Sequence, residues 1–205
     1  YKAFVLICVV QRGEQVYIPD GNFELHSGDR IGIVGAPAEI TKFLKNISML
    51  KKQAKDVMIL GGSKTAFYLA KMLIAAGHSV KIIEMKEEKA QMLAENLRKA
   101  AVICGDGAQQ ELLLEEGLDS MDAFVALTGI DEENILLSYF AAGKKVQKVI
   151  AKVNRDEFTP IAEDLGIESV ISPKDIVSDI VVRYVRALNN TVGSSMDTLY
   201  KVMDG

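Results

Sequence analysis

Short runs of apolar residues, separated by turns, fill the first fifty positions of the chain. These runs lie at residues 3–10, 16–18 and 30–34. Glycine-containing segments divide them, which is typical of short strands joined by tight connections. After Pro37 the apolar residues recur at helical spacing, which predicts an amphipathic helix over residues 38–49. Residues 1–50 are therefore predicted to form a small α+β subdomain, and the polar, basic residues 51–56 to form a linker.

From residue 57 the pattern changes to strands that alternate with helices. Strand-like apolar runs are expected at residues 57–60, 80–84, 101–104, 123–127, 149–153 and 169–171. Helical periodicity separates these runs, and glycines stand where C-caps are expected: Gly77, Gly117, Gly143 and Gly166. Consecutive strands separated by helices pair in parallel through crossover connections. Residues 57–172 are thus predicted to form a doubly wound, parallel, Rossmann-like α/β sheet with strand order 3-2-1-4-5-6.

A long amphipathic helix is predicted after the last strand. Ser172 and Pro173 combine an N-cap with a proline at the first helical position. An apolar stripe follows them, and such a stripe must be buried against something. We expect the helix at residues 173–188 to cross to another domain or subunit as an assembly helix, or else to cover the sheet itself. The polar residues 189–205 are expected to form a loose tail.

Composition narrows the class of protein. The chain of 205 residues is 49% hydrophobic and 25% charged, as folded proteins are, and its net charge of −4 argues against a nucleic-acid partner. The longest apolar run, residues 3–10, is far shorter than the ~20 residues that a membrane span needs. Because the chain opens almost directly on a strand and without Met, we expect it to be a fragment of a longer protein. Cys8 and Cys104 lie in apolar runs and are expected to be free, buried thiols in a reducing cytoplasm.

A glycine turn joins the first strand of the predicted sheet to its first helix. Such a turn binds a pyrophosphate through backbone N–H groups and the helix dipole. The dinucleotide fingerprint has Gly at its first and third positions and Gly or Ala at its sixth. Gly61 and Ala66 fit this pattern, whereas Ser63 stands where the second Gly is usual and either crowds a phosphate or donates to it. Gly62 completes the turn, and Lys64 could add a cation at the phosphates.

Polar residues at the ends of the following strands surround the same crevice. Glu84 ends the second strand, where a carboxylate can accept hydrogen bonds from ribose hydroxyls. Asp106 follows the third strand and Thr128 the fourth. The carboxyl ends of parallel strands meet at one edge of the sheet, so a nucleotide site is predicted there. The alternative is an ordinary helix start with incidental charged residues on the surface.

No catalytic or metal-binding constellation is recognisable. His26 lies in a turn of the small subdomain, and His78 lies at the end of the sheet opposite to the crevice. The two cysteines form no CxxC pair, so no metal or redox site is expected. The acidic run at residues 131–133 opens a helix, where negative charge favours the helix dipole. The chain is therefore not expected to be an enzyme. An NAD-dependent oxidoreductase fragment and a ligand-free docking module remain the alternative classes.

Together these segments resemble the TrkA-type RCK (regulator of potassium conductance) domain family. The resemblance is carried by the run at residues 57–66, by Glu84, by Gly105 with Asp106, and by residues 126–134. In the small subdomain, Arg12-Gly13, Pro19-Asp20-Gly21 and Ser27-Gly28-Asp29 resemble the C-terminal subdomain of the same family. The order of the two parts implies the end of one module followed by the Rossmann domain of the next.

The resemblance implies a regulatory function. Members of this family are cytosolic regulatory subunits of potassium transporters, peripheral to the inner face of the membrane, which bind NAD, NADH or ATP/ADP. Gly61, Ser63 and Lys64 would face the phosphates, Glu84 the ribose, and Asp106 and Thr128 the adenosine side. The bound nucleotide would control ion uptake through assembly, so a homo-oligomer (a dimer or a tetrameric ring) and a membrane potassium-transporter subunit are the expected partners. Because Ser63 replaces the usual Gly, a module that binds only a mononucleotide or nothing is an alternative.

Overall fold

The computed structural model describes residues 4–49, 54–167 and 169–189 of the chain. The chain divides into two compact units, one of which is Gln53–Tyr184, while the other contains residues 4–49. Half of the predicted linker, residues 51–53, and nearly all of the predicted loose tail, residues 190–205, lie outside the described residues.

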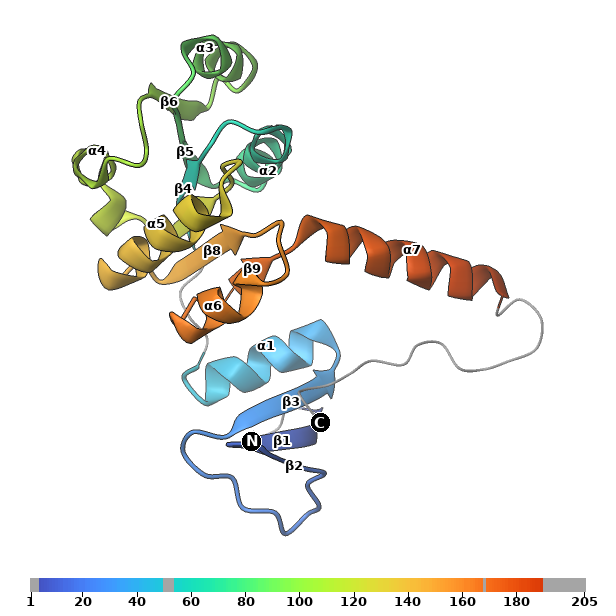
Figure 1. Cartoon of the computed structure of the whole chain (residues 1–205). Coiled ribbons are helices and arrows are strands. Elements are labelled where there is room, and N and C mark those ends of the chain that lie inside the picture. The colour runs from blue at the N-terminus through green and yellow to red at the C-terminus, as the bar shows by residue number, and fades with distance from the viewer. Residues whose placement is uncertain (1–3, 50–53, 168, 190–205) are drawn as a thin grey trace. The chain divides into compact units, whose positions relative to one another are not determined.

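The smaller unit is a three-stranded antiparallel sheet with one helix (Figure 1). Its elements are β1 (Val5–Arg12), β2 (Gln15–Tyr17), β3 (Arg30–Gly35) and α1 (Pro37–Asn46). The central strand β1 pairs with both others, in the order β2-β1-β3. Gly13 makes the turn between β1 and β2 with a positive φ of 61°, and Pro37 begins α1, where a proline costs no hydrogen bond. The predicted α+β character of this part is confirmed.

The larger unit is built around a six-stranded parallel sheet. Its strands are β4 (Asp56–Leu60), β5 (Ser79–Glu84), β6 (Ala100–Cys104), β7 (Ala123–Ala126), β8 (Lys148–Lys152) and β9 (Ser169–Ile171). They lie in the order β6-β5-β4-β7-β8-β9 and all pair in parallel. This is the predicted order 3-2-1-4-5-6, so the prediction of a doubly wound, Rossmann-like α/β fold is confirmed.

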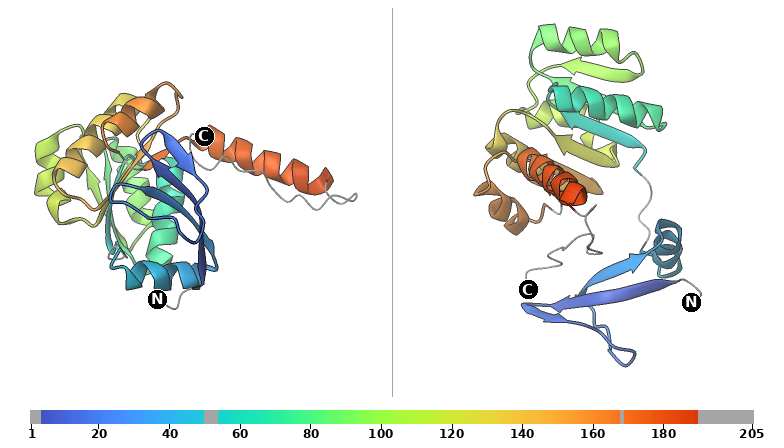
Figure 2. Two further views of the ribbon diagram at one scale, coloured as in Figure 1. Left: turned by 90° about the horizontal axis from the view of Figure 1, so that it is seen from below. Right: turned by 90° about the vertical axis from the view of Figure 1, so that its right-hand side faces the viewer.

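Helices cover both faces of this sheet (Figure 2). They are α2 (Lys64–Ala75), α3 (Glu87–Asn96), α4 (Gln110–Glu115), α5 (Asp131–Gly143) and α6 (Phe158–Asp164), with a short 3-10 turn at Leu118–Ser120. Alternate residues of β4 enter opposite layers: Ile59 packs with α2 and α3, while Met58 packs with α4 and α5. Both side chains are fully buried. The apolar runs seen in the sequence are therefore strands that are buried on two sides.

Glycines end most of the helices where the sequence predicts them. Gly77, Gly117 and Gly166 adopt a positive φ between 81° and 87° directly after α2, α4 and α6. The helix α5 also ends at the predicted glycine, Gly143, but this residue is the last of the helix and does not adopt a positive φ. The left-handed conformation is instead taken by Lys145, with a φ of 68°. The turn out of α5 is thus placed by the packing of the following segment, whose Val146 is buried in the core beside α5.

The two cysteines are free, but they are not both buried. Cys8 is half-buried in β1, where its thiol contacts the carbonyl oxygen of Gly32. Cys104 is exposed, which contradicts the prediction of a buried thiol. The reason is its strand: β6 lies at the edge of the sheet and has a neighbour on one side only. An apolar run at an edge strand does not guarantee burial on both faces.

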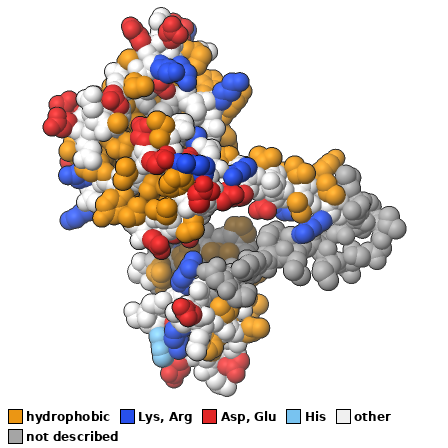
Figure 3. Space-filling view, viewed as in Figure 1, with side chains coloured by type: hydrophobic (Ala, Val, Ile, Leu, Met, Phe, Trp, Pro, Cys, Tyr) orange, Lys and Arg blue, Asp and Glu red, His pale blue; other side chains and the backbone are white. Residues whose placement is uncertain are grey.

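The last described helix, α7 (Pro173–Asn189), begins at the predicted proline. Its apolar side chains are exposed in the single chain, as Figure 3 shows for the helix surface. Ile180 is 54% and Tyr184 65% exposed. The stripe therefore does not cover the sheet, which is the alternative expectation for this helix. Within the described part of the chain, no helix combines the length and apolar character needed to cross a bilayer.

Candidate functional site

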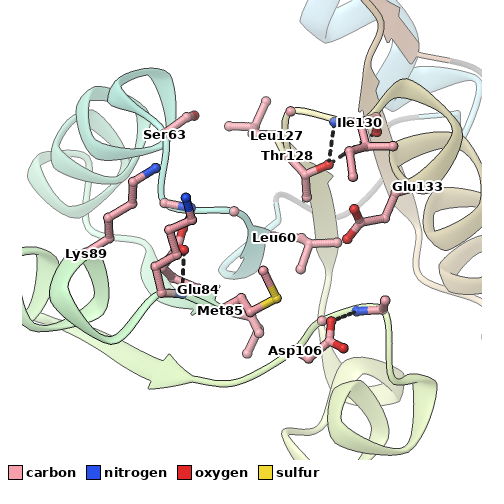
Figure 4. A pocket seen from close by; sticks show the side chains of 17 residues that line it. Leu60, Ser63, Glu84, Met85, Lys89, Asp106, Leu127, Thr128, Ile130 and Glu133 are labelled. Atoms are coloured by element: carbon pink, nitrogen blue, oxygen red, sulfur yellow. Dashed lines mark hydrogen bonds between the residues drawn. The ribbon is translucent and has the colours of Figure 1, made fainter.

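A cavity of about 470 Å³ opens at the carboxyl ends of β4, β5, β6 and β7 (Figure 4). This volume lies within the range of ligand pockets, about 300–1,000 Å³. The predicted site residues that line it are Gly61, Gly62, Ser63, Glu84, Asp106 and Thr128. Segments far apart in the sequence thus meet where the strand order changes direction, as expected for a doubly wound sheet.

The glycine turn after β4 leaves no room for side chains. Gly61 has a φ of +93°, and a Cβ atom there would lie 3.0 Å from the backbone nitrogen of Thr128. A Cβ atom on Gly62 would lie 2.6 Å from Oε2 of Glu84 and 2.7 Å from a methyl group of Leu93. The turn therefore runs in close contact with the end of β7 on one side and with Glu84 on the other. Glycine is required here by close approach as well as by conformation.

Glu84 is held at the floor of the cavity by two backbone groups. Its Oε2 accepts the N–H of Gly62 at 2.6 Å, and its Oε1 accepts the N–H of Lys86 at 2.8 Å. Only 7% of the residue is exposed. An ionised carboxylate offers about four acceptor positions, so each oxygen keeps one for a ligand hydroxyl. The arrangement orients a carboxylate that can still accept hydrogen bonds from a vicinal diol.

Ser63 caps the helix that follows the glycine turn. Its Oγ accepts the N–H of Ala66 at 3.2 Å, while its backbone has the extended conformation of an N-cap. The hydroxyl still has its own proton, which it can donate to a ligand oxygen at the mouth of the cavity. Ala66 is fully buried, as the sixth position of the fingerprint requires for close packing of helix and strand.

Lys64 is placed differently from the other predicted residues. It is the exposed first residue of α2, and it does not line the cavity. The lysines that do line it are Lys86, which precedes α3, and Lys89 in the first turn of α3. In Figure 4, Lys89 extends toward the glycine turn from that side. The sequence signal that could have identified these lysines is their position shortly after Glu84, at the start of the next helix.

The loop between β7 and α5 is fixed by a buried amide. Asn134 is fully buried, and its Oδ1 accepts the backbone N–H of Thr128 at 3.0 Å and the hydroxyl of Thr128 at 2.8 Å. Its Nδ2 donates to the carbonyl oxygen of Lys152 at 2.9 Å. Asn134 thereby ties the loop to β8 and holds Thr128 at the rim of the cavity. Asn134 therefore has a structural role: it fixes the position of a loop that lines the cavity.

The acidic run at the start of α5 separates into three different environments. Asp131 is buried and accepts the N–H groups of Asn154 and Arg155, each at 3.0 Å. Burial of the carboxyl opposes ionisation, but these hydrogen bonds outweigh it and lower the pKa of Asp131. Glu132 pairs with Arg155 at the surface. These two residues connect α5 to the segment after β8 and take no part in the cavity.

Glu133, the third residue of the run, lines the cavity. Burial raises the pKa of its carboxyl, and the negative charge of Asp106 raises it further, while a hydrogen bond with Thr128 acts in the opposite direction. Figure 4 shows its carboxylate turned into the space beside Leu60. The prediction that the acidic residues occupy the first turn of a helix is confirmed. That prediction did not identify Glu133 as a residue of the site.

The histidines stand apart from the cavity. Nδ1 of His78 lies 2.8 Å from the carbonyl oxygen of Ala54, directly before β5 and thus at the opposite end of the sheet. His26 is exposed in the smaller unit. In the described ranges, no three side chains of His, Cys, Asp or Glu come together as a metal ion would need. The polar side chains that line the cavity, among them Ser63, Glu84 and Lys89, offer hydrogen bonding and charge to a ligand.

Models of two protein families match the chain. The TrkA-N domain model matches residues 57–173, which is more than half of the chain, and the TrkA-C domain model matches residues 2–48. The chain belongs to the TrkA-N domain family. The resemblance recognised in the sequence is thereby confirmed for both parts. The TrkA-N match includes the whole glycine turn and every strand that contributes to the cavity.

Known relatives of this TrkA-N chain are named for potassium uptake. The Trk system potassium uptake protein TrkA of Vibrio alginolyticus is 33% identical over 168 residues, which make up 82% of this chain and 36% of that protein. The chain thus spans about a third of the length of this relative. The crystal structure of the GsuK RCK domain has a TM-score of 0.62 at 16% identity and covers 91% of this chain and 40% of its own. A structure of the GsuK channel bound to NAD has a TM-score of 0.60, also at 16% identity, and covers 91% of this chain and 33% of its own. At such identity these two structures show a shared fold.

Proposed function

We propose that this chain is a nucleotide-binding regulatory part of a potassium-transport protein. It binds NAD or NADH in the cavity at the carboxyl ends of β4–β7 and acts through this binding and not through catalysis. The observation that carries the proposal is Glu84, a buried carboxylate held beside the glycine turn by two backbone N–H groups with acceptor positions to spare. A carboxylate in this place binds the ribose hydroxyls of a dinucleotide and disfavours a 2′-phosphate.

The rest of the cavity supports the same ligand class. The N-terminus of α2 and the hydroxyl of Ser63 offer donors to a pyrophosphate, since the first N–H groups of a helix lack intrahelical partners. Lys86 and Lys89 add positive charge to the lining. In this proposal Gly61, Gly62 and Ser63 face the phosphates, while Asp106 and Thr128 lie along the adenosine side. Lys64 can approach the phosphates only through a change in its side-chain position.

We also propose a role for each domain, by analogy with the family. Residues 1–50 act as the C-terminal-type subdomain of one RCK module, and residues 57–172 as the nucleotide-binding domain of the next. The helix at 173–188 carries exposed apolar side chains and is proposed to be the assembly contact of a homo-oligomer. The oligomer, in the cytoplasm at the inner face of the membrane, would change its packing with the bound nucleotide and so regulate a transporter subunit. A ligand can shift such a ring only as far as it prefers one state.

Capping by Ser63 favours one competing possibility. Because Oγ of Ser63 already satisfies the N–H of Ala66, one donor of the helix start is not free for a phosphate. If this cap closes the pyrophosphate position, the cavity would bind a mononucleotide such as ATP or ADP, or it would bind no ligand at all. The ligand-free module would then act as a docking part of the same complex.

Equilibrium binding of the purified chain to NAD+, NADH, NADP+, ATP and ADP tests the proposal. Glu84→Gln keeps the shape of the residue but removes its charge and one acceptor oxygen, so NAD+ and NADH affinity should fall about tenfold or more. Glu88→Gln, exposed on α3 and outside the cavity lining, is the matched control and should bind as the unaltered chain does.

Each outcome of this panel has a distinct meaning. Preference for NAD+ or NADH over NADP+, weakened in Glu84→Gln alone, supports the proposal. Preference for ATP or ADP moves the ligand to an adenine nucleotide at the same site. Absence of binding at millimolar concentration contradicts nucleotide regulation and favours the docking module. Turnover of nicotinamide with small alcohols or acids would contradict the regulatory assignment and favour an oxidoreductase.

A further inference from the structure

The cavity has opposite charges on its two sides. Lys86 and Lys89 line it from the start of α3, whereas Glu133 and Asp106 line it from α5 and from the segment after β6. Figure 4 shows Lys89 and Glu133 on opposite sides of the opening. A phosphate bound at the glycine turn would be attracted by the lysines and repelled by the acidic side. The sign of the charge on that side therefore affects which ligands can be accommodated.

Contact between the two loops brings this acidic side close to the phosphate position. A Cβ atom on Gly61 would lie 3.1 Å from the carbonyl oxygen of Leu127, so the glycine turn and the β7–α5 loop touch each other. Thr128 follows in this loop and interacts with Glu133. Glu133 and the glycine turn line the same cavity, and charges that are partly buried are screened by salt much less than exposed ones. A phosphate at the turn and the carboxylate of Glu133 therefore interact without full screening.

We propose that Glu133 couples nucleotide binding to the protonation state of the cavity: its carboxylate opposes ligand phosphates, and it takes up a proton from solvent when they bind. This inference rests on the proposed nucleotide site and adds a charge-selective residue to it. Glu133 is the suitable group because it is half-buried and faces Asp106, a second carboxylate. A further negative charge from a ligand makes its ionised form still less favourable.

The direction of the effect follows from linkage. If ligand phosphates raise the proton affinity of Glu133, the complex holds more protons than the free chain, so ligand affinity rises as the pH falls. The other charged groups around Glu133 are Asp106 across the cavity, Glu84, Lys86 and Lys89 from β5 and α3, and Asp131, Glu132 and Arg155 on its own side. Asp131 and Glu132 are already engaged by hydrogen bonds or ion pairs, which favours their ionised forms at the pH values of the test.

The test compares ADP-ribose with adenosine at pH 5 and pH 8. ADP-ribose carries its charge on a pyrophosphate diester, which does not titrate between these values, whereas a terminal phosphate has a pKa of about 6. We expect the chain to bind ADP-ribose severalfold more tightly at pH 5 than at pH 8, up to a limit of about tenfold for each unit by which the ligand raises the pKa of Glu133. Adenosine, which has no phosphate, should bind equally at both values and so reports that the cavity is intact.

Two variants decide the assignment. Glu133→Gln should bind ADP-ribose at pH 8 at least as tightly as the unaltered chain does at pH 5, with a flat profile. Glu132→Gln, one residue earlier and outside the cavity, should keep the original profile. A pH dependence that survives in Glu133→Gln, or one that adenosine shares, overturns this inference and leaves the nucleotide site standing. Failure of every nucleotide to bind at either pH overturns the proposed function and this inference with it.

Discussion

The two units of the chain use the same kind of strand sequence to reach different structures. In the larger unit, the strand residues Met58, Ile59 and Phe124 are completely buried between two layers of helices. In the smaller unit, Leu6 of β1 is 65% exposed, although it too lies in an uninterrupted apolar run. Both runs predict strands correctly. The number of layers that cover the sheet, and not the run itself, determines how much of each strand is buried.

The smaller unit buries few apolar side chains, and a close ion pair contributes to its stability. Among residues 4–49, Val10 has a fully buried apolar side chain, and Val9 is 8% exposed. Arg12 forms a two-point ion pair with Asp29, at 2.7 and 2.8 Å, and donates to the carbonyl oxygen of Glu24 at 3.0 Å. This pair ties the long connection between β2 and β3 to the central strand. One unit therefore depends mainly on its core, and the other on an ion pair beside a thin apolar layer.

The largest contrast is expected from shortening one apolar side chain in each unit. Ile59→Ala leaves a void in a closed core and should lower the free energy of unfolding by about 2–5 kcal/mol. Leu6→Ala removes an exposed side chain and should change it by less than about 0.5 kcal/mol. Urea denaturation followed by circular dichroism measures both. Equal effects would show that the sheet of the smaller unit is covered by another surface in solution.

A pair of glycines compares the turns of the two units. Gly61 and Gly13 both have a positive φ, but of the two only Gly61 has backbone atoms of another segment, the β7–α5 loop, within 3.1 Å of an added Cβ atom. Gly13→Ala should cost about 1 kcal/mol, from conformation alone. Gly61→Ala adds a steric clash with the β7–α5 loop and should cost on the order of 3 kcal/mol. Thermal unfolding measures the difference, and similar costs would mean that the two loops are not in contact.

Acid should separate the units through Asp29. The hydrogen bonds and charge of Arg12, followed by the backbone N–H of His26, hold the pKa of Asp29 far below its usual range. The stabilisation is complete above the unfolded pKa of about 3.9 and is lost as the pH falls toward the folded value. Amide hydrogen exchange should therefore show that residues 4–49 lose protection below about pH 4, before the sheet of the larger unit does.

Asp29→Asn is the control for this acid effect. The variant lacks the ionised carboxylate at every pH, so protection of the smaller unit should be lower at neutral pH and should lose most of its dependence below pH 4. An unchanged acid profile in Asp29→Asn would assign the acid sensitivity to other carboxylates. The larger unit provides an internal reference in the same experiment.

The smallest change in folding stability is expected on α7. Ile180→Glu places a charge on an apolar stripe that is exposed in the single chain, so the free energy of unfolding of the monomer should change by less than about 0.5 kcal/mol. Self-association should nevertheless decrease, because the stripe loses its apolar character. Size-exclusion chromatography with light scattering measures this. Ser178→Glu adds the same charge at an exposed polar position of α7, and an equal effect of both variants would contradict an assembly role for the stripe.

Much of the site could be predicted because its determinants are local. The glycine turn, the carboxylate at the end of β5 and the residues after β6 and β7 are each set by their position in a strand–turn–helix unit. Parallel strands then bring their carboxyl ends together, so Gly61, Glu84, Asp106 and Thr128 meet without further information. The strand order followed from the same alternation of strands and helices.

Tertiary structure alone decided which charged side chains enter the cavity. Lys64 begins a helix but is exposed and does not line the cavity, while Lys86, Lys89 and Glu133, also at helix starts, do line it. A helix start fixes where the backbone lies, but the direction of each side chain depends on how that helix packs against the sheet. The exposure of Cys104 depends likewise on its strand lying at an edge. The sequence by itself thus determined the elements and their order, because periodicity is local, whereas burial and side-chain direction depended on neighbours distant in the chain.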